Sequence, residues 1–364
     1  MSIVPSEPLV RFRGVQKSYD GQTLVVRNLD LNIQHGEFLS LLGPSGSGKT
    51  TCLMMLAGFE FPTAGDIFLD GQRLNDVPPH KRNIGMVFQN YALFPHMTVE
   101  KNLHYPLKVR NVAADERRKR VAEALAMVQM SAFAKRYPGQ LSGGQQQRIA
   151  LARALVFDPK LVLMDEPLGA LDKQLREHMQ LELKALHRSL GITFVYVTHD
   201  QSEALTMSDR VAVFDQGVIQ QISPVRTLYE EPCNRFVASF VGDCNQIEGR
   251  VESLHGEQCL VRLTDGSMVQ ALNIGQLQAG ARCVLAIRPE RMGIAQGPQA
   301  VNMLPAQAQD QVYFGDHIRL RCRILDSTVF VKLPLDQKAS LGACGAGGPL
   351  FLSVRTEHAR AFKP

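Results

Sequence analysis

A glycine-rich stretch at 43–50 limits the fold of this chain more than any other feature, and its sequence is GPSGSGKT. It fits the pattern Gly-x4-Gly-Lys-Ser/Thr and lies between an apolar strand-like run and a helical pattern. Gly46 and Gly48 allow the backbone to curl so that several N–H groups face one phosphate, and the helix N-terminus adds partial positive charge. Lys49 would neutralise the β- and γ-phosphates. A plain glycine turn is the alternative, but this context favours a nucleotide-binding phosphate loop.

A second apolar run, at 161–164, ends in the adjacent acids Asp165 and Glu166. A near-continuous apolar strand is typical of a parallel sheet, where an acid at the carboxyl end of a strand can reach a nucleotide. Asp165 and Thr50 would hold Mg²⁺, and Glu166 would polarise the attacking water. Alone, such a pair is more often a solvated turn, but beside a phosphate loop it indicates ATP hydrolysis. The candidate nucleotide contacts in the loop are Gly43, Ser45, Gly46, Ser47, Gly48, Lys49, Thr50 and Thr51.

A third motif, Leu-Ser-Gly-Gly-Gln at 141–145, directly precedes an amphipathic helix and lies between the other two in the sequence. By itself it could be a helix start, since Ser142 is a good capping residue. The order and spacing of the three motifs, however, closely resemble the ATP-hydrolysing subunits of ABC transporters. This resemblance implies that the signature turn at 141–145 faces the γ-phosphate of a nucleotide bound by a second protomer. The candidate contacts are Ser142, Gly143, Gly144 and Gln145.

Four further positions match the same family residue by residue. The resemblance implies that Tyr19 stacks on adenine, and that Gln89 touches Mg²⁺ and the attacking water and senses the membrane partner. It also implies that Asp172 crosses a dimer interface and that His199 contacts the γ-phosphate. Singly, these residues could be a surface aromatic and ordinary polar loop residues, but their order makes that reading improbable. Gly169 departs from the family, where many relatives carry Ser, and this bears only on signalling across the interface.

The 364 residues of the chain exceed one typical domain. The pattern of apolar and polar residues changes near residue 242. Residues 1–242 alternate strand-like and helical patterns, which predicts an α/β P-loop ATPase domain with a helical subdomain at about 89–140. A helical pattern at 224–240 is expected to pack on this domain. Residues 243–364 show short alternating segments between turns, which predicts a β-rich barrel, and Ala-Ile-Arg-Pro-Glu at 286–290 resembles the OB-like regulatory domain of importer ATPases. The other helical patterns lie at 49–56, 115–129, 145–156, 173–190 and 201–207.

Composition limits the environment of the chain. Seven cysteines without a Cys-x-x-Cys pair indicate reduced thiols rather than disulfides or zinc. The start of the chain lacks the pattern of a signal peptide, and no apolar run reaches the roughly 20 residues that cross a bilayer. The net charge of +5 is spread out, and the second domain lacks closely spaced aromatic pairs that stack on bases. We therefore expect a peripheral protein on the cytoplasmic face of the inner membrane that binds no nucleic acid. The Gly/Ala-rich stretch at 340–348 predicts a loop.

The resemblance also implies partners. The chain holds one copy of each motif, so a homodimer around two ATP molecules would complete each site with the signature turn of the other protomer. Hydrolysis would then drive two membrane permease subunits, to which a solute-binding protein delivers the solute. The sequences at 78–82 and 88–98 are most similar to those of importers of polyamines, opines and phosphonates. Importers of sugars and ferric ion share much of the same sequence. A soluble ABC ATPase without a transport role is the other alternative, although such relatives usually carry two ATPase halves or a long coiled coil.

Overall fold

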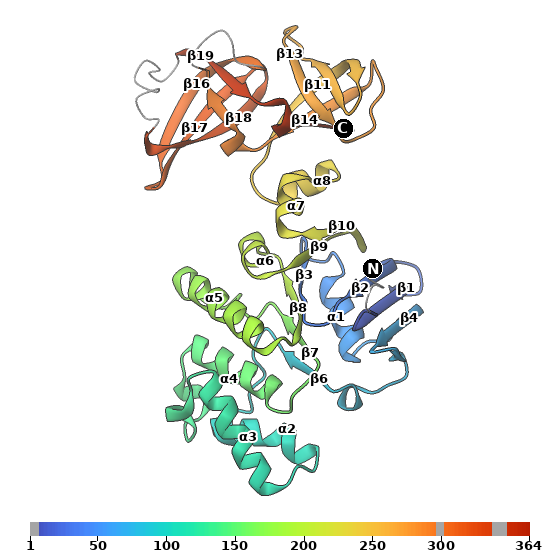
Figure 1. Cartoon of the computed structure of the whole chain (residues 1–364), viewed down its shortest axis with the longest axis vertical. Coiled ribbons are helices and arrows are strands. Elements are labelled where there is room, and N and C mark those ends of the chain that lie inside the picture. Colours follow the sequence, from blue (N-terminus) through green and yellow to red (C-terminus); the bar gives the residue numbers. More distant parts are fainter. Residues whose placement is uncertain (1–6, 296–301, 337–347) are drawn as a thin grey trace, which may run out of the picture. The chain divides into compact units, whose positions relative to one another are not determined.

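The computed structural model describes residues 7–295, 302–336 and 348–364. Its contacts divide the chain into two units, Met1–Arg226 and Thr227–Pro364, and Figure 1 shows their elements. Residues 340–347 of the expected loop, with Cys344, lie outside the described ranges. Within these ranges, Cys52, Cys244, Cys259 and Cys283 are free thiols. No helix in the described part is long and apolar enough to cross a membrane.

A six-stranded sheet in the order β10-β9-β3-β8-β7-β6 forms the centre of the first unit. Strands β6, β7, β8, β3 and β9 run parallel, and β10 pairs antiparallel with β9. Alternate side chains enter opposite cores: Leu161 and Leu163 pack on one face of β7, and Val162 and Met164 on the other. The strands are β3 (Phe38–Leu42), β6 (Ile84–Val87), β7 (Leu161–Asp165), β8 (Thr193–Thr198), β9 (Arg210–Asp215) and β10 (Val218–Pro224).

Each face of the central sheet is covered. One face packs with helix α1 and a four-stranded antiparallel sheet in the order β2-β1-β4-β5, and the other packs with α4, α5 and α6. The antiparallel strands are β1 (Val10–Ser18), β2 (Leu24–Ile33), β4 (Ala64–Leu69) and β5 (Gln72–Arg73). The helices are α1 (Lys49–Ala57), α4 (Gly143–Leu155), α5 (Lys173–Leu190) and α6 (Gln201–Met207).

The segment between β6 and β7 is helical, and Figure 1 shows α2, α3 and α4 grouped together. Their apolar faces form a separate core in which Leu103, Leu125 and Ile149 are buried. This segment includes the range 89–140 where a helical subdomain is expected, but its core also takes in α4, which lies beyond residue 140; the bounds of the subdomain stay a prediction. Its helices besides α4 are α2 (Val99–Val109), α3 (Ala114–Met127) and the short 3-10 turns η2 (Ser131–Phe133) and η3 (Pro138–Gln140), with η1 (Pro79–Lys81) preceding β6.

The second unit contains a closed five-stranded barrel in the order β11-β12-β13-β20-β14 and a five-stranded sheet in the order β15-β19-β16-β17-β18. The two share one apolar core. The barrel confirms the expected β-rich, barrel-type fold. Its strands are β11 (Asn245–His255), β12 (Gln258–Arg262), β13 (Met268–Asn273), β14 (Arg282–Ile287) and β20 (Ala359–Phe362). The sheet comprises β15 (Met292–Ile294), β16 (Met303–Tyr313), β17 (His317–Ile324), β18 (Ser327–Pro334) and β19 (Pro349–Val354), with turns η4 (Pro289–Arg291) and η6 (Thr356–His358).

The expectation of one continuous helix at 224–240 is wrong, whereas its packing on the ATPase domain stays a prediction. The segment forms two short helices, α7 (Val225–Glu230) and α8 (Arg235–Phe240), because Pro232 cannot donate a helical hydrogen bond and Asn234 caps a new start. Ala238 of α8 packs with two barrel residues, Ala286 and Phe362. The contacts thus group residues 227–242 with the second unit, whereas the boundary drawn from sequence texture at 242 stays a prediction.

Candidate functional site

The predicted acids, histidine and phosphate loop meet at one edge of the central sheet. Strand β3 ends at Leu42 just before the loop, and Leu42 pairs with Thr198, the residue before His199. Asp165, the last residue of β7, pairs with Val197 of β8. Because carboxyl ends of neighbouring parallel strands face one side, groups distant in sequence become neighbours there. This is the crevice position where α/β proteins bind ligands.

Lys49 lies inside the curl of the phosphate loop. Its side chain is buried, and its ammonium donates to Gly43 O at 2.8 Å, Pro44 O at 2.7 Å and Ser47 Oγ at 3.2 Å. Burial lowers the pKa of Lys49, while the carboxylates of Glu166 and Asp165 act in the opposite direction. A buried cation among neutral oxygens is well placed to gain an anionic partner.

Gly48 starts α1 in a conformation that other residues avoid. Its φ is 99°, and a Cβ there would lie 2.7 Å from Val25 O. No side chain caps this helix start. The first N–H groups of α1 therefore stay available for phosphate oxygens, with the positive end of the helix dipole behind them.

Asp165 and Thr50 place two side-chain oxygens next to each other. The Thr50 hydroxyl donates to Asp165 Oδ1 at 3.0 Å. Burial raises the pKa of Asp165, the Thr50 hydrogen bond opposes this, and Glu166 adds to it. Within the described ranges no group of three or more His, Cys, Asp or Glu could hold a metal. The side-chain oxygens of Asp165 and Thr50 fit Mg²⁺, which takes one or two protein oxygens and completes its coordination shell with water and phosphate.

Glu166 and His199 contact each other beside this pair. His199 Nδ1 lies 3.0 Å from Glu166 Oε1, and the side chains are 58% and 23% exposed. Glu166 adopts a left-handed φ of 45° and is held there by its N–H, which donates to Val197 O at 3.0 Å. A strained, half-buried carboxylate with an oriented imidazole can position and polarise a water molecule.

The signature turn lies outside this cluster. Ser142 caps α4 and forms a reciprocal capping box with Gln145, at 3.0 and 3.4 Å. Asp172 likewise caps α5 by accepting from Leu175 N at 2.9 Å. Between residues 7 and 226, no hydrogen bond or ion pair that we observe joins residues 142–145 to the phosphate loop. Both capping residues therefore serve their own helices within one protomer.

Tyr19 and Gln89 are also exposed. Tyr19 is 60% exposed, and Lys17 Nζ lies 4.7 Å from the centre of its ring. Lys17 is itself fixed by Phe61 O at 2.9 Å and Glu60 at 2.8 Å, so one face of the ring is supported. Gln89 lies in the turn after β6. Their roles stay predictions.

Sequence reasoning missed the arginines that hold the loops around this edge. Arg153 of α4 donates to Ala92 O at 2.7 Å and Tyr91 O at 2.8 Å, just after Gln89. Both acceptor residues have left-handed backbones, with φ of 45° and 61°. Arg153 binds to backbone carbonyl groups, and because every residue has one, the sequence does not show which carbonyl an arginine will bind. The only available signal was an arginine in an otherwise apolar helical stretch.

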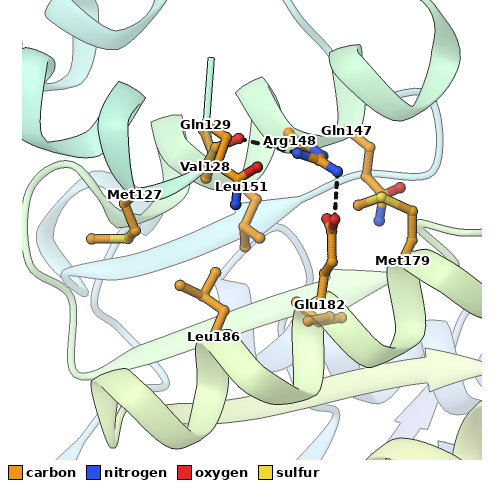
Figure 2. Close-up of a pocket in the computed structure, with 10 residues that line it drawn as sticks. Met127, Val128, Gln129, Gln147, Arg148, Leu151, Met179, Glu182 and Leu186 are labelled. Carbon is orange, nitrogen blue, oxygen red and sulfur yellow. Dashed lines mark hydrogen bonds and ion pairs between the residues drawn. The ribbon is translucent and has the colours of Figure 1, made fainter. Parts of the chain in front are cut away.

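A cavity of about 90 Å³ lies between the end of α3, α4 and α5, and Figure 2 shows its lining. Arg148 of α4 crosses its rim, bonding Glu182 of α5 at 2.5 Å and Val128 O at 3.5 Å. The buried Gln147 Oε1 has no described hydrogen-bond partner, and the cavity is large enough for water to supply one. None of its lining residues is a predicted site residue, so this cavity is distinct from the nucleotide edge.

Comparison with known proteins identifies the family. The model of the ABC transporter family matches residues 26–169, and that of the TOBE domain matches residues 285–362. The spermidine/putrescine import ATP-binding protein PotA of Rubrobacter xylanophilus is 49% identical over 319 residues, which cover 87% of this chain and 84% of that protein. The chain belongs to the ABC transporter ATP-binding proteins. PotA of Thermobifida fusca is 46% identical over 96% of this chain and 92% of its own length, so the likeness of this ABC ATPase extends through the second unit.

A solved ABC cassette supports the same conclusion for the first unit. The dimeric post-hydrolysis structure of the ATP-binding cassette MJ0796 with ADP and Pi is 37% identical, with a TM-score of 0.54. It covers 60% of this chain and 99% of the solved chain. The predicted resemblance, fold class and ATPase activity are thereby confirmed for this ABC ATPase, whereas the role of each site residue stays a prediction.

Proposed function

We propose that this ABC ATPase acts as a homodimer around two Mg·ATP and powers the import of polyamines through two membrane permease subunits. A solute-binding protein would deliver the solute, and the chain would work from the cytoplasmic face of the inner membrane. The contact between Glu166 and His199, beside the Asp165–Thr50 pair, supports hydrolysis best. The names of the relatives, spermidine/putrescine import proteins, support the substrate class.

The residues at the sheet edge divide the chemistry among them. The phosphate loop and the first N–H groups of α1 would bind the β- and γ-phosphates, with Lys49 supplying positive charge. Asp165 and Thr50 would hold Mg²⁺, which neutralises phosphate charge when bound. Glu166 would accept a hydrogen bond from the attacking water, and His199 would keep that carboxylate in place and face the γ-phosphate.

The exposed residues would act between protomers and on the base. The signature turn lies apart from the phosphate loop of its own chain, so Ser142 and Gly144 would face the nucleotide of the partner protomer. Asp172 would lie at the same interface. Tyr19 would stack on adenine with its free face, because Lys17 supports the other. The dimeric solved relative supports this arrangement.

Glu166→Gln tests the hydrolytic assignment. The amide keeps the shape but cannot accept a proton, so Mg·ATP binding should persist while turnover falls by at least about 100-fold. ATP, but not ADP, should then trap a dimer in size-exclusion chromatography. Glu177→Gln, on the exposed side of α5, is the matched control and should hydrolyse normally. Wild-type turnover in the Glu166 variant would remove Glu166 from the mechanism.

Reconstitution tests the transport assignment. The chain would be combined in liposomes with the permeases and solute-binding protein of its own gene cluster, and ATP-driven uptake would be measured. Putrescine or spermidine should stimulate hydrolysis and accumulate inside, while maltose and ferric ion should do neither. Stimulation only by a sugar or by iron would overturn the polyamine proposal and leave the ATPase assignment intact.

A further inference from the structure

Arg176, near the start of α5, holds two loops that meet at the nucleotide edge. Its Nη2 donates to Leu171 O at 2.9 Å, and its Nη1 donates to Asp200 Oδ2 at 3.2 Å. Its side chain is 28% exposed, and Nε lies 3.8 Å from Glu203 Oε1, in range for ion pairing but not for a hydrogen bond. One guanidinium therefore spans the segment before α5 and the segment before α6.

Each loop leads directly back to one member of the Glu166–His199 pair. Gly169 N donates to Glu166 O at 3.2 Å, and Leu171 N donates to Leu168 O at 3.1 Å, so the turn after Glu166 is continuous with the Leu171 carbonyl. On the other side, Asp200 directly follows His199. Contacts and short stretches of backbone therefore connect Arg176 with both Glu166 and His199, which also contact each other.

The Asp200 side of these contacts is anchored in the core. Glu203 is 2% exposed, and its Oε2 accepts from Tyr196 Oη and Thr198 Oγ1, both at 2.7 Å. Asp200 N also donates to Thr198 Oγ1 at 2.9 Å. Asp200 and Glu203, the two acids that face Arg176, are thus fixed to the end of β8. Because the guanidinium group is rigid and planar, it holds the Leu171 carbonyl at a set distance from these acids.

We propose that Arg176 is a positioning residue that sets the distance between Glu166 and His199. The inference rests on the proposed roles of these two residues in hydrolysis. Arg176 itself reaches neither of them in any contact that the structure describes, so it acts through the loops. Misplacement of a catalytic group by about 1 Å can lower a rate by about 100-fold. A change in the distance between Glu166 and His199 should therefore slow the chemical step without weakening nucleotide binding.

Arg176→Met tests the proposal with two controls. We expect kcat to fall by about 10- to 100-fold, with the Kd for Mg·ATP within about twofold of wild type, because no phosphate-loop group is touched. Arg176→Lys keeps the charge but not the fork, and should recover part of the rate. Arg188→Met removes an exposed arginine of the same helix and should leave kcat unchanged. Unchanged kcat in a folded Arg176→Met chain would overturn the proposal.

A double-mutant cycle separates positioning from general destabilisation. If Arg176 acts through the catalytic pair, Arg176→Met should change the single-turnover rate of a His199→Ala chain by less than about twofold. Equal factors in both backgrounds would overturn the proposal. If the His199→Ala rate is too slow to measure, a crystal structure of Arg176→Met decides: the Oε1–Nδ1 separation should exceed 3.0 Å, and an unchanged separation would refute it. Wild-type hydrolysis by Glu166→Gln would instead refute the proposed function.

Discussion

Arg288→Met should loosen the two short helices from the barrel of the second unit. Arg288 directly follows β14, begins the Arg-Pro-Glu turn and is 8% exposed. Its Nη1 donates to Ala238 O at 2.9 Å and to Asp243 O at 3.0 Å, and its Nη2 donates to Tyr229 O at 3.3 Å. The guanidinium also stacks over the Tyr229 ring at 4.3 Å. Methionine keeps the apolar stem and removes every one of these donors.

The size of the effect follows from these contacts. A hydrogen bond to a charged group contributes about 1.5–3 kcal/mol. The two shorter bonds count nearly in full, whereas the long third bond counts little. We therefore expect a loss of about 3–5 kcal/mol in the free energy of unfolding of this unit. At about 3 °C per kcal/mol for a unit of this size, the melting temperature should fall by about 10–15 °C. Arg288→Lys should lose about half as much, because a single ammonium cannot reach all three carbonyls.

Calorimetry of the full chain measures the shift, and hydrogen exchange locates it. Amides of residues 235–246 and 283–288 should lose protection, while those of the central sheet should keep it. Arg282→Met removes an exposed arginine from β14, the strand that precedes Arg288, and serves as the matched control. A melting temperature within about 1 °C of wild type, with unchanged exchange at 235–246, would refute the stabilisation we assign to Arg288.

Three further predictions concern the nucleotide site. Lys49→Ala should weaken ATP binding by at least about 100-fold in equilibrium titrations, because it removes the cation inside the phosphate loop. Ser142→Arg should spare binding by the monomer and block ATP-induced dimerisation in sedimentation experiments; equal loss of affinity in both variants would contradict the two-protomer site. A truncated chain ending at Arg226 should still bind Mg·ATP and retain some hydrolysis, since the candidate site residues lie before it. A folded truncated chain that cannot bind ATP would show that the second unit contributes to the site.

Local patterns were enough to predict the elements that form the candidate nucleotide site. The phosphate loop, the strand at 161–164 and the helix at 173–190 follow from short-range chemistry, and β7 and α5 confirm the strand and the helix. The antiparallel sheet was missed although β1 alternates buried Val10 and Phe12 with exposed Arg11, a period-2 signal. The helix expected at 224–240 passed over Pro232, which should have ended it.

The arginine contacts could not be predicted, for a physical reason. Arg288 and Arg153 donate to backbone carbonyls that lie 50 and 61 residues away in the sequence. Arg176 joins the nearby carbonyl of Leu171 to Asp200, which lies 24 residues away. Every residue presents a carbonyl, so the acceptor carries no compositional signature, and only the fold decides which one is within reach. Apolar periodicity predicts which face of a helix is buried, but it does not predict which groups the polar side chains of that helix will bind.

The same contacts explain how polar loops keep their shape next to a rigid sheet. Segments at the carboxyl ends of the strands bury some apolar side chains, such as Leu168 and Leu171, but their backbone polar groups also need hydrogen-bond partners. A guanidinium offers five donors in a planar fork and can hold several carbonyls at once. Buried Arg82 shows the full use of this geometry, with Met55 O, Leu56 O, Leu74 O and Val77 O all within 2.7–2.9 Å. Hydrogen bonds of this kind are directional, so the guanidinium fixes where each carbonyl group points, whereas apolar packing is non-directional and cannot do so.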